Sequence, residues 1–510
     1  MNEVQSQDEV LAFLADGATY GGRAVRRIDT HAASVFLAGD RALKVKRAVR
    51  FPFLDYSTLR KRKEACEAEL AVNAPYAPEI YRGVVPIARE ADGKLAIAGA
   101  GNPVEWAVEM RRFDETRTLD HLAGDISEAL ADALGDAVAA AHQKAPIVDA
   151  APWIDALKTY LDQNLAAFRE MPDVFEPEAA AALDRHSREV YARIKPLLAE
   201  RGRLGRVRRG HGDLHLGNIV LIDDRPVLFD AIEFDPLIAA GDVLYDLAFL
   251  LMDLCERSRA QAANIVLNRY LAETLRIDDL DGLATLPYFL SLRAAIRAKV
   301  TAARIEHAGP PQRAAIARSA RTYFEFARRA IVPPAPVCIA VGGLSGSGKS
   351  HVARALAPYI VPLPGAVVVR SDVERKALFG VCETAKLPAE AYTSAVSERV
   401  YAILIDKARR VLAAGHSAVV DAVFAQKHER DAIAAAAKFA NVRFDGLFLT
   451  ANLETRIARV GGRAHDASDA DEMVARAQER YDLGALDWKT IDASGTVEET
   501  LMRARAALAL

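Results

Sequence analysis

The chain has 510 residues, of which 51% are apolar and 26% are charged, and its formal net charge at pH 7 is −3. This length predicts two or three domains, and the near-neutral charge argues against a nucleic-acid partner. Four widely spaced cysteines exclude a disulfide framework and a zinc ribbon. The acidic start MNEVQSQDEV and the lack of a long apolar run predict neither a secretion signal nor a membrane span. We therefore expect a soluble, cytoplasmic protein without a membrane partner.

A proline-rich seam divides the chain. The stretch RRAIVPPAPVCIAVGG, residues 328–343, contains three prolines that stop a helix, and the buried-strand pattern VCIAV follows directly. We predict a first domain at 1–330, a linker at 331–336 and a second domain at 337–510.

The first domain opens with a strand pattern that contains two lysines. Polar and apolar residues alternate in SVFLAGDRALKVKR, residues 34–47, as expected for half-buried strands. Lys44 and Lys46 lie two positions apart and therefore on the same side of a strand, with Lys44 in the buried run. The next pattern, LRKRKEACEAELAVN at 59–73, predicts a helix that carries Glu69.

The stretch GHGDLHLGN, residues 210–218, combines two histidines, an aspartate and an asparagine with three glycines. His211 and His215 have the spacing of a zinc pair on a helix. The glycines disfavour a helix, however, and no third cysteine or histidine ligand lies nearby in the sequence. We therefore expect a polar loop in which the histidines do not bind metal.

Two short apolar runs after this loop, IVLI at 219–222 and PVLF at 226–229, predict a β-hairpin. A hairpin brings Asn218, before its first strand, next to Asp230, after its second strand, and Asp213 approaches the same place. Two carboxylates and an amide oxygen provide the hard-oxygen ligands that Mg²⁺ prefers. One carboxylate would remain free to accept a proton from an incoming hydroxyl group.

The pattern H-G-D-x-x-x-x-N at 211–218, together with GDVLYDLAFL at 241–250, resembles the aminoglycoside phosphotransferase family. The resemblance covers most of 20–330. It implies an α+β, protein-kinase-like bilobal domain, with an N-terminal lobe at about 20–113 and a C-terminal lobe at about 114–330.

The resemblance also implies roles for single residues. Asp213 would be the catalytic base, Asn218 and Asp230 would bind the metal ion, and Asp246 would brace the catalytic loop. His211 is expected to be structural.

A kinase of this kind needs a strand lysine that binds the α- and β-phosphates and a helix glutamate that holds this lysine. Lys44 is the preferred lysine, with Lys46 in reserve, and Glu69 fits the family spacing ahead of Glu67. No G-x-G-x-x-G motif precedes the lysine strand, as is often the case in this family. Glu233, after the hairpin, remains open between a second metal ligand and a solvated surface charge.

The second domain begins with GLSGSGKS, residues 343–350, which matches G-x-x-x-x-G-K-[ST] at every specified position. The motif lies between the strand pattern VCIAV and the helix pattern HVARALAPYI, as a phosphate-binding loop requires. Lys349 would reach the β- and γ-phosphate oxygens, and the hydroxyl group of Ser350 would bind Mg²⁺. Backbone N–H groups near the glycines would bind the β-phosphate. The other residues assigned to nucleotide binding in this loop are Gly343, Ser345, Gly346, Ser347 and Gly348.

Short apolar runs alternate with amphipathic stretches after this loop. They predict an α/β P-loop domain with a parallel sheet flanked by helices. Two of the runs end in acidic residues, Asp372 in VVVRSDVERK and Asp421 in SAVVDAVF. Because ligands bind beyond the carboxyl ends of parallel strands, both residues should face the phosphate site. Each could accept a proton or hold hydrated Mg²⁺, or could instead cap a helix.

Three arginines follow the last apolar run, at Arg456, Arg459 and Arg463. On a segment above the phosphates, they would stabilise charge on the transferred phosphoryl group. A solvated helix face is the alternative.

Together, these motifs resemble the small P-loop kinases of the gluconate-kinase and zeta-toxin kind over roughly 336–510. The resemblance implies that Asp372 orients the acceptor as a base, that Asp421 lies on the metal side, and that Arg459 and Arg463 belong to a lid. The pairing of the two domains resembles a bacterial two-domain class described as an ATPase with an aminoglycoside-phosphotransferase region.

These patterns lead to one leading hypothesis and several alternatives. The leading one is a bifunctional kinase that uses ATP and Mg²⁺ to phosphorylate small hydroxylated molecules of the sugar, amino-sugar or polyol class. Successive steps on one metabolite are one form of this hypothesis. In a second hypothesis, one half is an ATP-binding regulatory module for the other. A third makes the C-terminal half a polynucleotide-end kinase, against which the near-neutral charge counts.

Overall fold

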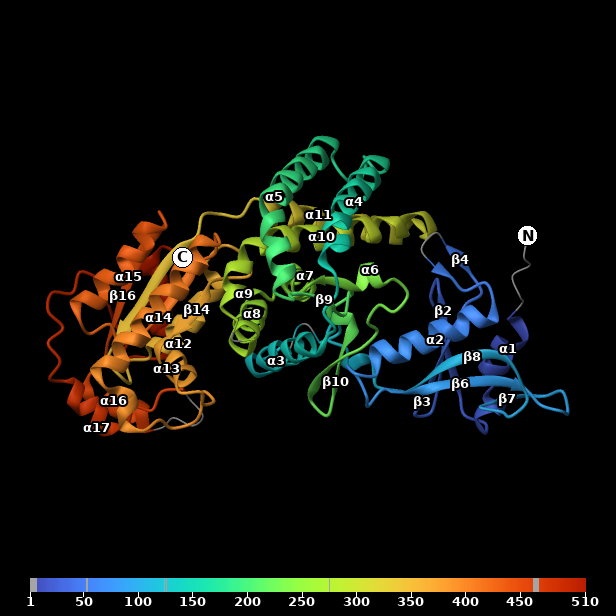
Figure 1. Ribbon diagram of the computed structural model, residues 1–510, viewed down its shortest axis with the longest axis horizontal. Coiled ribbons are helices and arrows are strands. Elements are labelled where there is room, and N and C mark those ends of the chain that lie inside the picture. Colours follow the sequence, from blue (N-terminus) through green and yellow to red (C-terminus); the bar gives the residue numbers. More distant parts are fainter. Residues whose placement is uncertain (1–6, 52–53, 123, 125, 275, 462–466) are drawn as a thin grey trace. The chain divides into compact units, whose positions relative to one another are not determined.

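The structure is a computed structural model that describes residues 7–51, 54–122, 124, 126–274, 276–461 and 467–510 (Figure 1). The chain packs into two compact units, Met1–Leu157 with Ala199–Leu250, and Lys158–Leu198 with Leu251–Leu510. The domain boundary that we placed at 331–336 stays a prediction. Packing assigns the helices just before this boundary to the same unit as the domain after it.

The first unit contains a six-stranded antiparallel sheet in the order β1-β2-β3-β8-β6-β7. The strands are β1 (Val25–Asp29), β2 (Ala33–Ala38), β3 (Arg41–Lys46), β6 (Tyr81–Arg89), β7 (Leu95–Ile97) and β8 (Asn102–Arg111). Helix α2 (Leu59–Asn73) packs against β8 and β6. It begins after Thr58, whose side chain accepts a hydrogen bond from the N–H group of Lys61.

The two faces of this sheet have separate apolar cores, because side chains alternate along each strand. Val45 and Ala107 pack on the face that helix α1 (Asp8–Ala15) covers. Val108 packs with Cys66 of α2 on the other face. Lys44 lies opposite Val108 in the β3–β8 register, so its side chain is directed toward α2.

The predicted hairpin is confirmed. Strands β10 (Ile219–Ile222) and β11 (Arg225–Leu228) pair antiparallel, with Ile219 opposite Leu228. The turn consists of Asp223 and Asp224, both with positive φ (50° and 58°), so the second strand begins one residue earlier than predicted. Further elements of this unit are η1 (Gly17–Tyr20), β4 (Arg50–Phe51), β5 (Leu54–Asp55), η2 (Glu115–Arg117), α3 (Glu128–Lys144), β9 (Val207–Arg209), η4 (Leu216–Asn218), α6 (Pro236–Ala239), β12 (Ala240–Asp242) and most of α7 (Val243–Glu256).

The second unit begins with a group of helices. They are most of α4 (Ala150–Glu170) and α5 (Pro177–Arg203), α8 (Ala260–Thr274), α9 (Ile277–Gly282), η5 (Leu283–Thr285), α10 (Leu286–Ala303), η6 (Arg304–His307) and α11 (Pro310–Ile331). Helices α10 and α11 pack along each other. Phe168, Phe175 and Phe324 form an aromatic cluster among these helices, with ring centroids 4.6–5.2 Å apart. Pro333 and Pro334 follow the end of α11, as the sequence predicts.

The same unit contains a five-stranded parallel sheet in the order β14-β15-β13-β16-β17. Its strands are β13 (Val337–Gly343), β14 (Val367–Arg370), β15 (Ala418–Asp421), β16 (Arg443–Thr450) and β17 (Lys489–Asp492). Its helices are α12 (Lys349–Leu356), η7 (Ala357–Tyr359), α13 (Ser371–Leu378), η8 (Ala389–Tyr392), α14 (Ser394–Ala413), α15 (Lys427–Phe439), α16 (Leu453–Gly461), α17 (Glu472–Gln478) and α18 (Val497–Leu508).

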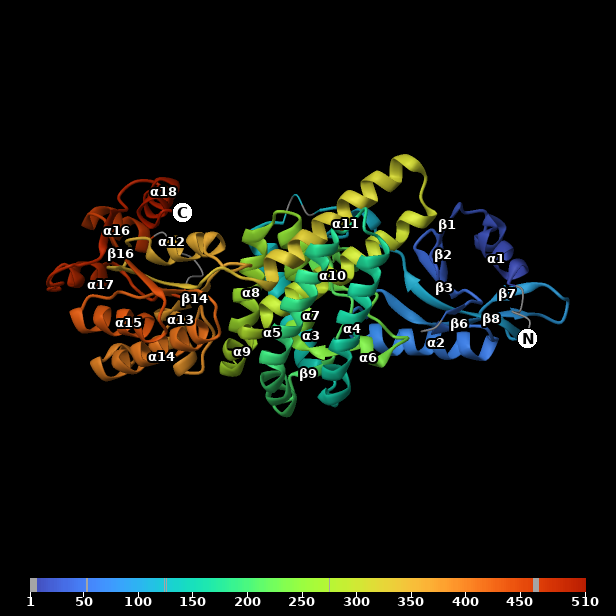
Figure 2. The same cartoon turned by 90° about the horizontal axis from the view of Figure 1, so that it is seen from above.

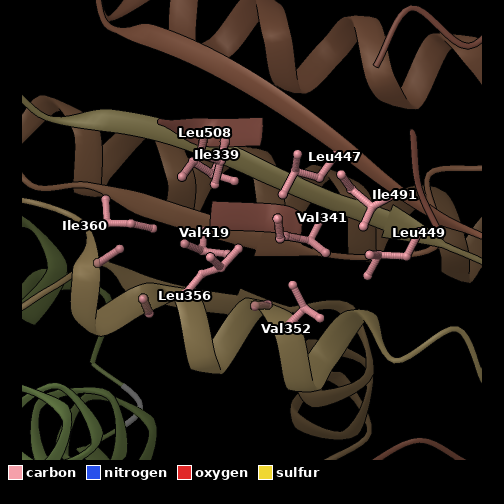
Figure 3. Packing of buried hydrophobic residues seen from close by; sticks show 14 of the residues in the cluster. Ile339, Val341, Val352, Leu356, Ile360, Val419, Leu447, Leu449, Ile491 and Leu508 are labelled. Atoms are coloured by element: carbon pink, nitrogen blue, oxygen red, sulfur yellow. The ribbon is translucent and has the colours of Figure 1, made fainter. Parts of the chain in front are cut away.

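Helices cover both faces of this sheet, as predicted. Figure 2 shows α12 and α18 on one face and α14 and α15 on the other. Ile339, Val341, Val419 and Leu447 of the sheet pack against Leu356 of α12 (Figure 3). Within the described residues, no helix has the length and the hydropathy that a membrane crossing requires.

Candidate active sites

The loop at 210–218 is held in shape by Asp246 of α7. Its two carboxylate oxygens accept hydrogen bonds from the backbone N–H groups of His211 (2.8 Å) and Gly212 (3.0 Å). His142 Nε2 lies 3.2 Å from the same carboxylate. The His211 ring bonds through Nε2 to the carbonyl oxygen of Phe229 (2.9 Å), and burial lowers the pKa of this ring below its ordinary value. His211 is therefore a buried, neutral group that joins the loop to the hairpin.

Asp213 and Asn218 are in direct contact. The Asn218 side-chain amide donates to the backbone oxygen (3.0 Å) and to Oδ2 (3.1 Å) of Asp213. His215 Nε2 lies 3.4 Å from the same carboxylate. Since the Asn218 NH₂ group makes these bonds, its amide oxygen is the atom that a cation could use.

The hairpin brings Asp230 to the same region. The N–H group of Phe229 donates to the carbonyl oxygen of Asn218 (3.0 Å), which ties the two ends of the hairpin together. Asp230 has a positive φ of 60°, and its N–H group donates to the hydroxyl group of Tyr81 (3.2 Å). The following residue, Ala231, exchanges two hydrogen bonds with the Asn73 side chain of α2 (2.7 and 3.1 Å).

Both strand lysines contact Glu69, but their other partners differ. Lys44 Nζ lies 2.8 Å from Glu69 and 2.7 Å from Asp230. Lys46 Nζ lies 2.6 Å from Glu69 and also pairs with Glu233. Burial alone would raise the pKa of Glu69, but the charges of Lys44 and Lys46 outweigh burial and lower this pKa to about 2. Lys44 therefore connects the helix glutamate to the candidate metal ligand, and Lys46 connects the same glutamate to Glu233.

Two of the expected alternatives for this site are resolved. Glu67 is half-exposed and pairs with Lys63 of the same helix (3.6 Å), so it does not reach the lysine strand. Glu233 is not a solvated surface charge, because its side chain is only 8% exposed and contacts both Lys46 and the Tyr56 hydroxyl group (3.4 Å). The surface alternative fails because the segment after the hairpin turns inward and brings Glu233 to Lys46 of β3.

The glycine-rich loop at 343–350 has the backbone that its sequence predicts. Gly343, Gly346 and Gly348 all have positive φ (146°, 83° and 90°). A Cβ on Gly346 would lie 2.5 Å from the carbonyl oxygen of Arg456, so only glycine fits there. Lys349 and Ser350 form the first turn of α12, whose N-terminus faces the loop.

Asp372 and Asp421 follow neighbouring strands, β14 and β15, at the same edge of the sheet. Neither residue caps a helix, so the capping alternative is wrong for both. Asp372 lies within the first turn of α13, whose N-cap is Arg370, and Asp421 is the last residue of β15. Arg370 Nε lies 3.4 Å from Asp421 Oδ2.

The arginines of α16 differ in their roles. Arg456 is buried and donates to the carbonyl oxygens of Ser345 (2.8 Å) and Ala475 (3.1 Å), so it joins the phosphate-binding loop to α17. Arg459 donates to the carbonyl oxygen of Gly495 (2.8 Å), and its Nη1 would lie 3.8 Å from a Cβ on Gly348. Arg459 therefore borders the loop. Arg463 lies outside the described residues.

Comparison with known proteins identifies the first half of the chain. A family model described as a phosphotransferase enzyme family matches residues 25–284, which make up half of the chain. The chain belongs to this phosphotransferase family. A second family model, described as an AAA domain, matches residues 337–482. The phosphotransferase thus combines a kinase-like fold with a C-terminal P-loop kinase fold, as predicted.

Several relatives and solved structures are similar to this phosphotransferase. Uncharacterized proteins of Mycobacterium tuberculosis and Mycobacterium bovis are 30% identical to it over 492 residues, which cover 93% of this chain and 94% of each relative. A choline/ethanolamine kinase family protein from Mesorhizobium loti is 15% identical, covering 64% of this chain and 98% of that chain, with a TM-score of 0.38. A gluconokinase from Sinorhizobium meliloti 1021 is 22% identical, covering 34% of this chain and 92% of that chain, with a TM-score of 0.26.

Several residues that make contacts around the P-loop site of the phosphotransferase were not predicted from sequence patterns. The Gln478 side chain accepts a hydrogen bond from the N–H group of Ser345 (2.7 Å). Asp469 accepts from Lys376 (2.6 Å), from the Leu387 N–H group (3.0 Å) and from the Tyr392 hydroxyl group (2.5 Å). These contacts join residues up to 133 positions apart, and only the clustering of polar residues after α16 could have suggested them.

The residues of both sites fit a nucleotide with a bound divalent cation. In the P-loop site, Asp421 Oδ1 and Ser347 Oγ are buried without a hydrogen-bond partner among the described residues. Such orphaned oxygens are expected where a ligand or a hydrated cation supplies the missing partner. In the other site, the carboxylate of Asp230 and the amide oxygen of Asn218 are hard-oxygen groups of the kind that Mg²⁺ prefers.

Proposed function

We propose that this phosphotransferase is a bifunctional ATP- and Mg²⁺-dependent kinase with one phosphoryl-transfer site in each half. The acceptors that we propose are small hydroxylated molecules of the sugar, amino-sugar or polyol class. The observation that carries the proposal is that each half combines a lysine at the position expected for phosphate binding with two acidic side chains, one suited to a cation and one suited to a base.

In the N-terminal site, Asp213 accepts the proton of the acceptor hydroxyl group. The hydroxyl oxygen bonds to the γ-phosphorus of ATP, and the bond between this phosphorus and the β–γ bridging oxygen breaks, so that ADP leaves. Asn218 holds Asp213 in place through its amide N–H groups. Lys44 exchanges its contact with Asp230 for the α- and β-phosphates, and Asp230 and Asn218 bind the cation. The cation neutralises charge on the phosphate oxygens when it is bound.

In the C-terminal site, the backbone N–H groups of the loop and Lys349 bind the phosphates. Ser350 and Asp421 hold the cation, Asp372 accepts the proton of the acceptor, and Arg459 stabilises charge on the transferred group. The position of Asp421 at the end of β15, next to the loop strand β13, supports this role.

The test is ADP release by the full chain across a panel of sugars, polyols and amino sugars. Wild type is compared with Asp213→Asn, with Lys349→Met and with the double variant, and Glu67→Gln is the matched control for an exposed carboxylate. We expect each single variant to abolish activity toward a different acceptor, and the double variant to be inactive.

Two outcomes would contradict the proposal. If neither single variant changes substrate-dependent ADP release, neither site is a kinase site. If Lys349→Met lowers the activity of the Asp213 site, and Asp372→Ala has no effect on any acceptor, the C-terminal half is a nucleotide-binding regulator instead.

A further inference from the structure

Strand β14 is at the edge of the parallel sheet. Among the described residues, β15 alone pairs with it, and its outer side faces no other strand. The backbone groups on the outer side of an edge strand need partners from water, side chains or another chain. At the start of this strand, two such groups find partners on helix α8, which lies next to β14 in the views of Figures 1 and 2.

The backbone N–H and C=O groups of successive residues in β14 point alternately toward β15 and away from it, and the hydrogen bonds match this alternation. The N–H group of Val367 points inward and donates to the carbonyl oxygen of Ser417 (2.9 Å). The groups that point outward therefore belong to the residues on either side, Ala366 and Val368. Asn268 accepts from the N–H group of Val368 (2.7 Å) and donates to the carbonyl oxygen of Ala366 (3.1 Å).

Asn264, one helical turn before Asn268, completes this pattern. Its amide group also donates to the carbonyl oxygen of Ala366 (3.0 Å), and the side chain is 2% exposed. A carboxamide carries the same donor and acceptor as a peptide group. At Ala366 and Val368, the two side chains thus supply the donor and the acceptor that the backbone of a sixth strand would supply.

The chain is also adapted to the close approach of the helix. A Cβ on Gly365 would lie 2.6 Å from Asn264 Nδ2, and Gly365 has a φ of 115°, so glycine is required at this point on both grounds. A second connection joins Arg410 of α14 to Asp281 of α9 (2.8 Å).

Strand β14 leads directly to the acceptor side of the P-loop site. It ends at Arg370, which pairs with Asp421, and Asp372 follows in the first turn of α13. Any shift of β14 along or away from β15 would therefore move Asp372 relative to the phosphate-binding loop, which follows β13.

We propose that Asn264 and Asn268 close the edge of the P-loop sheet and are positioning residues for Asp372. Helix α8, which precedes the predicted linker, is thereby an integral part of the C-terminal site. The positioning role rests on the proposed function, whereas the closure of the sheet edge does not.

The edge is tested in the full chain by hydrogen exchange with single-residue resolution. In Asn268→Ala, we expect the amide of Val368 to exchange about tenfold faster, the effect of one lost hydrogen bond. The amide of Val367 is the internal control and should keep its protection. Glu273→Gln, a half-exposed position of the same helix, is the control variant.

The positioning role is tested kinetically in an Asp213→Asn background, which leaves only the C-terminal site active. For Asn264→Ala and Asn268→Ala, we expect the KM for the acceptor to rise about tenfold and the KM for ATP to stay constant, because the loop and Lys349 are not moved. Single variants avoid the risk that the double variant does not fold.

Each readout has its own refutation. Unchanged exchange of Val368 in Asn268→Ala would show that the edge is not closed by this residue. Faster exchange with an unchanged acceptor KM, or with an equal rise in both KM values, would refute the positioning role. If wild type phosphorylates no acceptor at the C-terminal site, the proposed function fails and the positioning role with it, but the exchange of Val368 still decides whether α8 closes the sheet.

Discussion

The two lysines of β3 should separate activity from stability when each is replaced by methionine. Lys44 is 16% exposed and contacts Asp230, a residue that is itself half-exposed, so Lys44 can exchange this contact for a phosphate. Lys46 is 3% exposed and lies between two buried carboxylates, Glu69 and Glu233. We expect Lys44→Met to remove activity and Lys46→Met to lower stability.

The magnitudes follow from these environments. Lys46→Met leaves Glu69 with one cation, and it leaves Glu233 with the Tyr56 hydroxyl group as its side-chain partner among the described residues. Removing one member of a buried ion pair costs about 3–5 kcal/mol. In a unit of this size, such a loss lowers Tm by roughly 6–20 °C. Lys44→Met keeps the contact between Glu69 and Lys46. It should lower activity about 10²–10³-fold, as the loss of one charge-stabilising donor does, with little change in Tm.

Calorimetry and ADP release in a Lys349→Met background measure the two effects on the N-terminal site alone. Lys63→Met, a half-exposed lysine of α2, is the control. The pH dependence gives an independent check. The carboxyl group of Glu69 has a pKa of about 2 when folded, below its ordinary value of 4.5, so its stabilising effect is present above pH 4.5 and is lost toward pH 2. In Lys46→Met, this pKa rises toward its ordinary value, so the loss below pH 4.5 is smaller and is complete at a higher pH. Equal loss of activity in both variants without a fall in Tm for Lys46→Met would refute this division of roles.

Three further predictions concern other parts of the two units. Asp246→Ala leaves the N–H groups of His211 and Gly212 buried without acceptors, at about 1–3 kcal/mol each. Calorimetry should show a lower Tm, and an unchanged Tm would mean that the loop holds its shape without this brace. Gly346→Ala places a methyl group 2.5 Å from the Arg456 carbonyl oxygen and should weaken nucleotide binding at least about tenfold in a fluorescence titration. Gly415→Ala, with a similar φ of 75° but no atom within 4 Å, should bind normally, and equal binding by both variants would contradict the steric argument. Burial lowers the pKa of His416 from 6.5 to about 4, so the unfolded chain takes up a proton first as the pH falls. The free energy of unfolding should therefore decrease by up to about 3 kcal/mol between pH 6.5 and pH 4. Denaturant titrations of His416→Asn should show a flatter dependence, and parallel curves would exclude His416 as the source.

Local patterns predicted the elements that carry the candidate sites. The helix expected at 59–73 is α2, Leu59–Asn73, and the hairpin is displaced by one residue in its second strand. These predictions rest on periodicity, capping and turn residues, which act within a few positions of the chain. Strand β17 was missed because Lys489–Asp492 has a single buried residue and no apolar run.

Partners far apart in the sequence were beyond the same reasoning. The alternation of β3 places Lys44 and Lys46 on one face, but it contains no information on which of them meets Asp230 and which meets Glu233. That choice depends on the path of the chain after the hairpin, where Asn73 holds Ala231 and where Glu233 turns toward Lys46. A sequence pattern can therefore limit a catalytic lysine to two candidates, whereas the distribution of carboxylates around them decides between the two.

The arginines of α16 also show that a local sequence pattern does not predict which distant residues a side chain contacts. Arg456 and Arg459 lie three positions apart, so helical periodicity gives them nearly the same face. Arg456 nevertheless contacts Ser345 of the phosphate-binding loop, and its guanidinium group also contacts Gln478 and Ala475 of α17. Arg459 instead contacts Gly495. Helix α17, some twenty residues further along the chain, thus determines that Arg456 supports the shape of the loop. Arg459 is left at the border of the loop, where a transferred phosphoryl group would need positive charge.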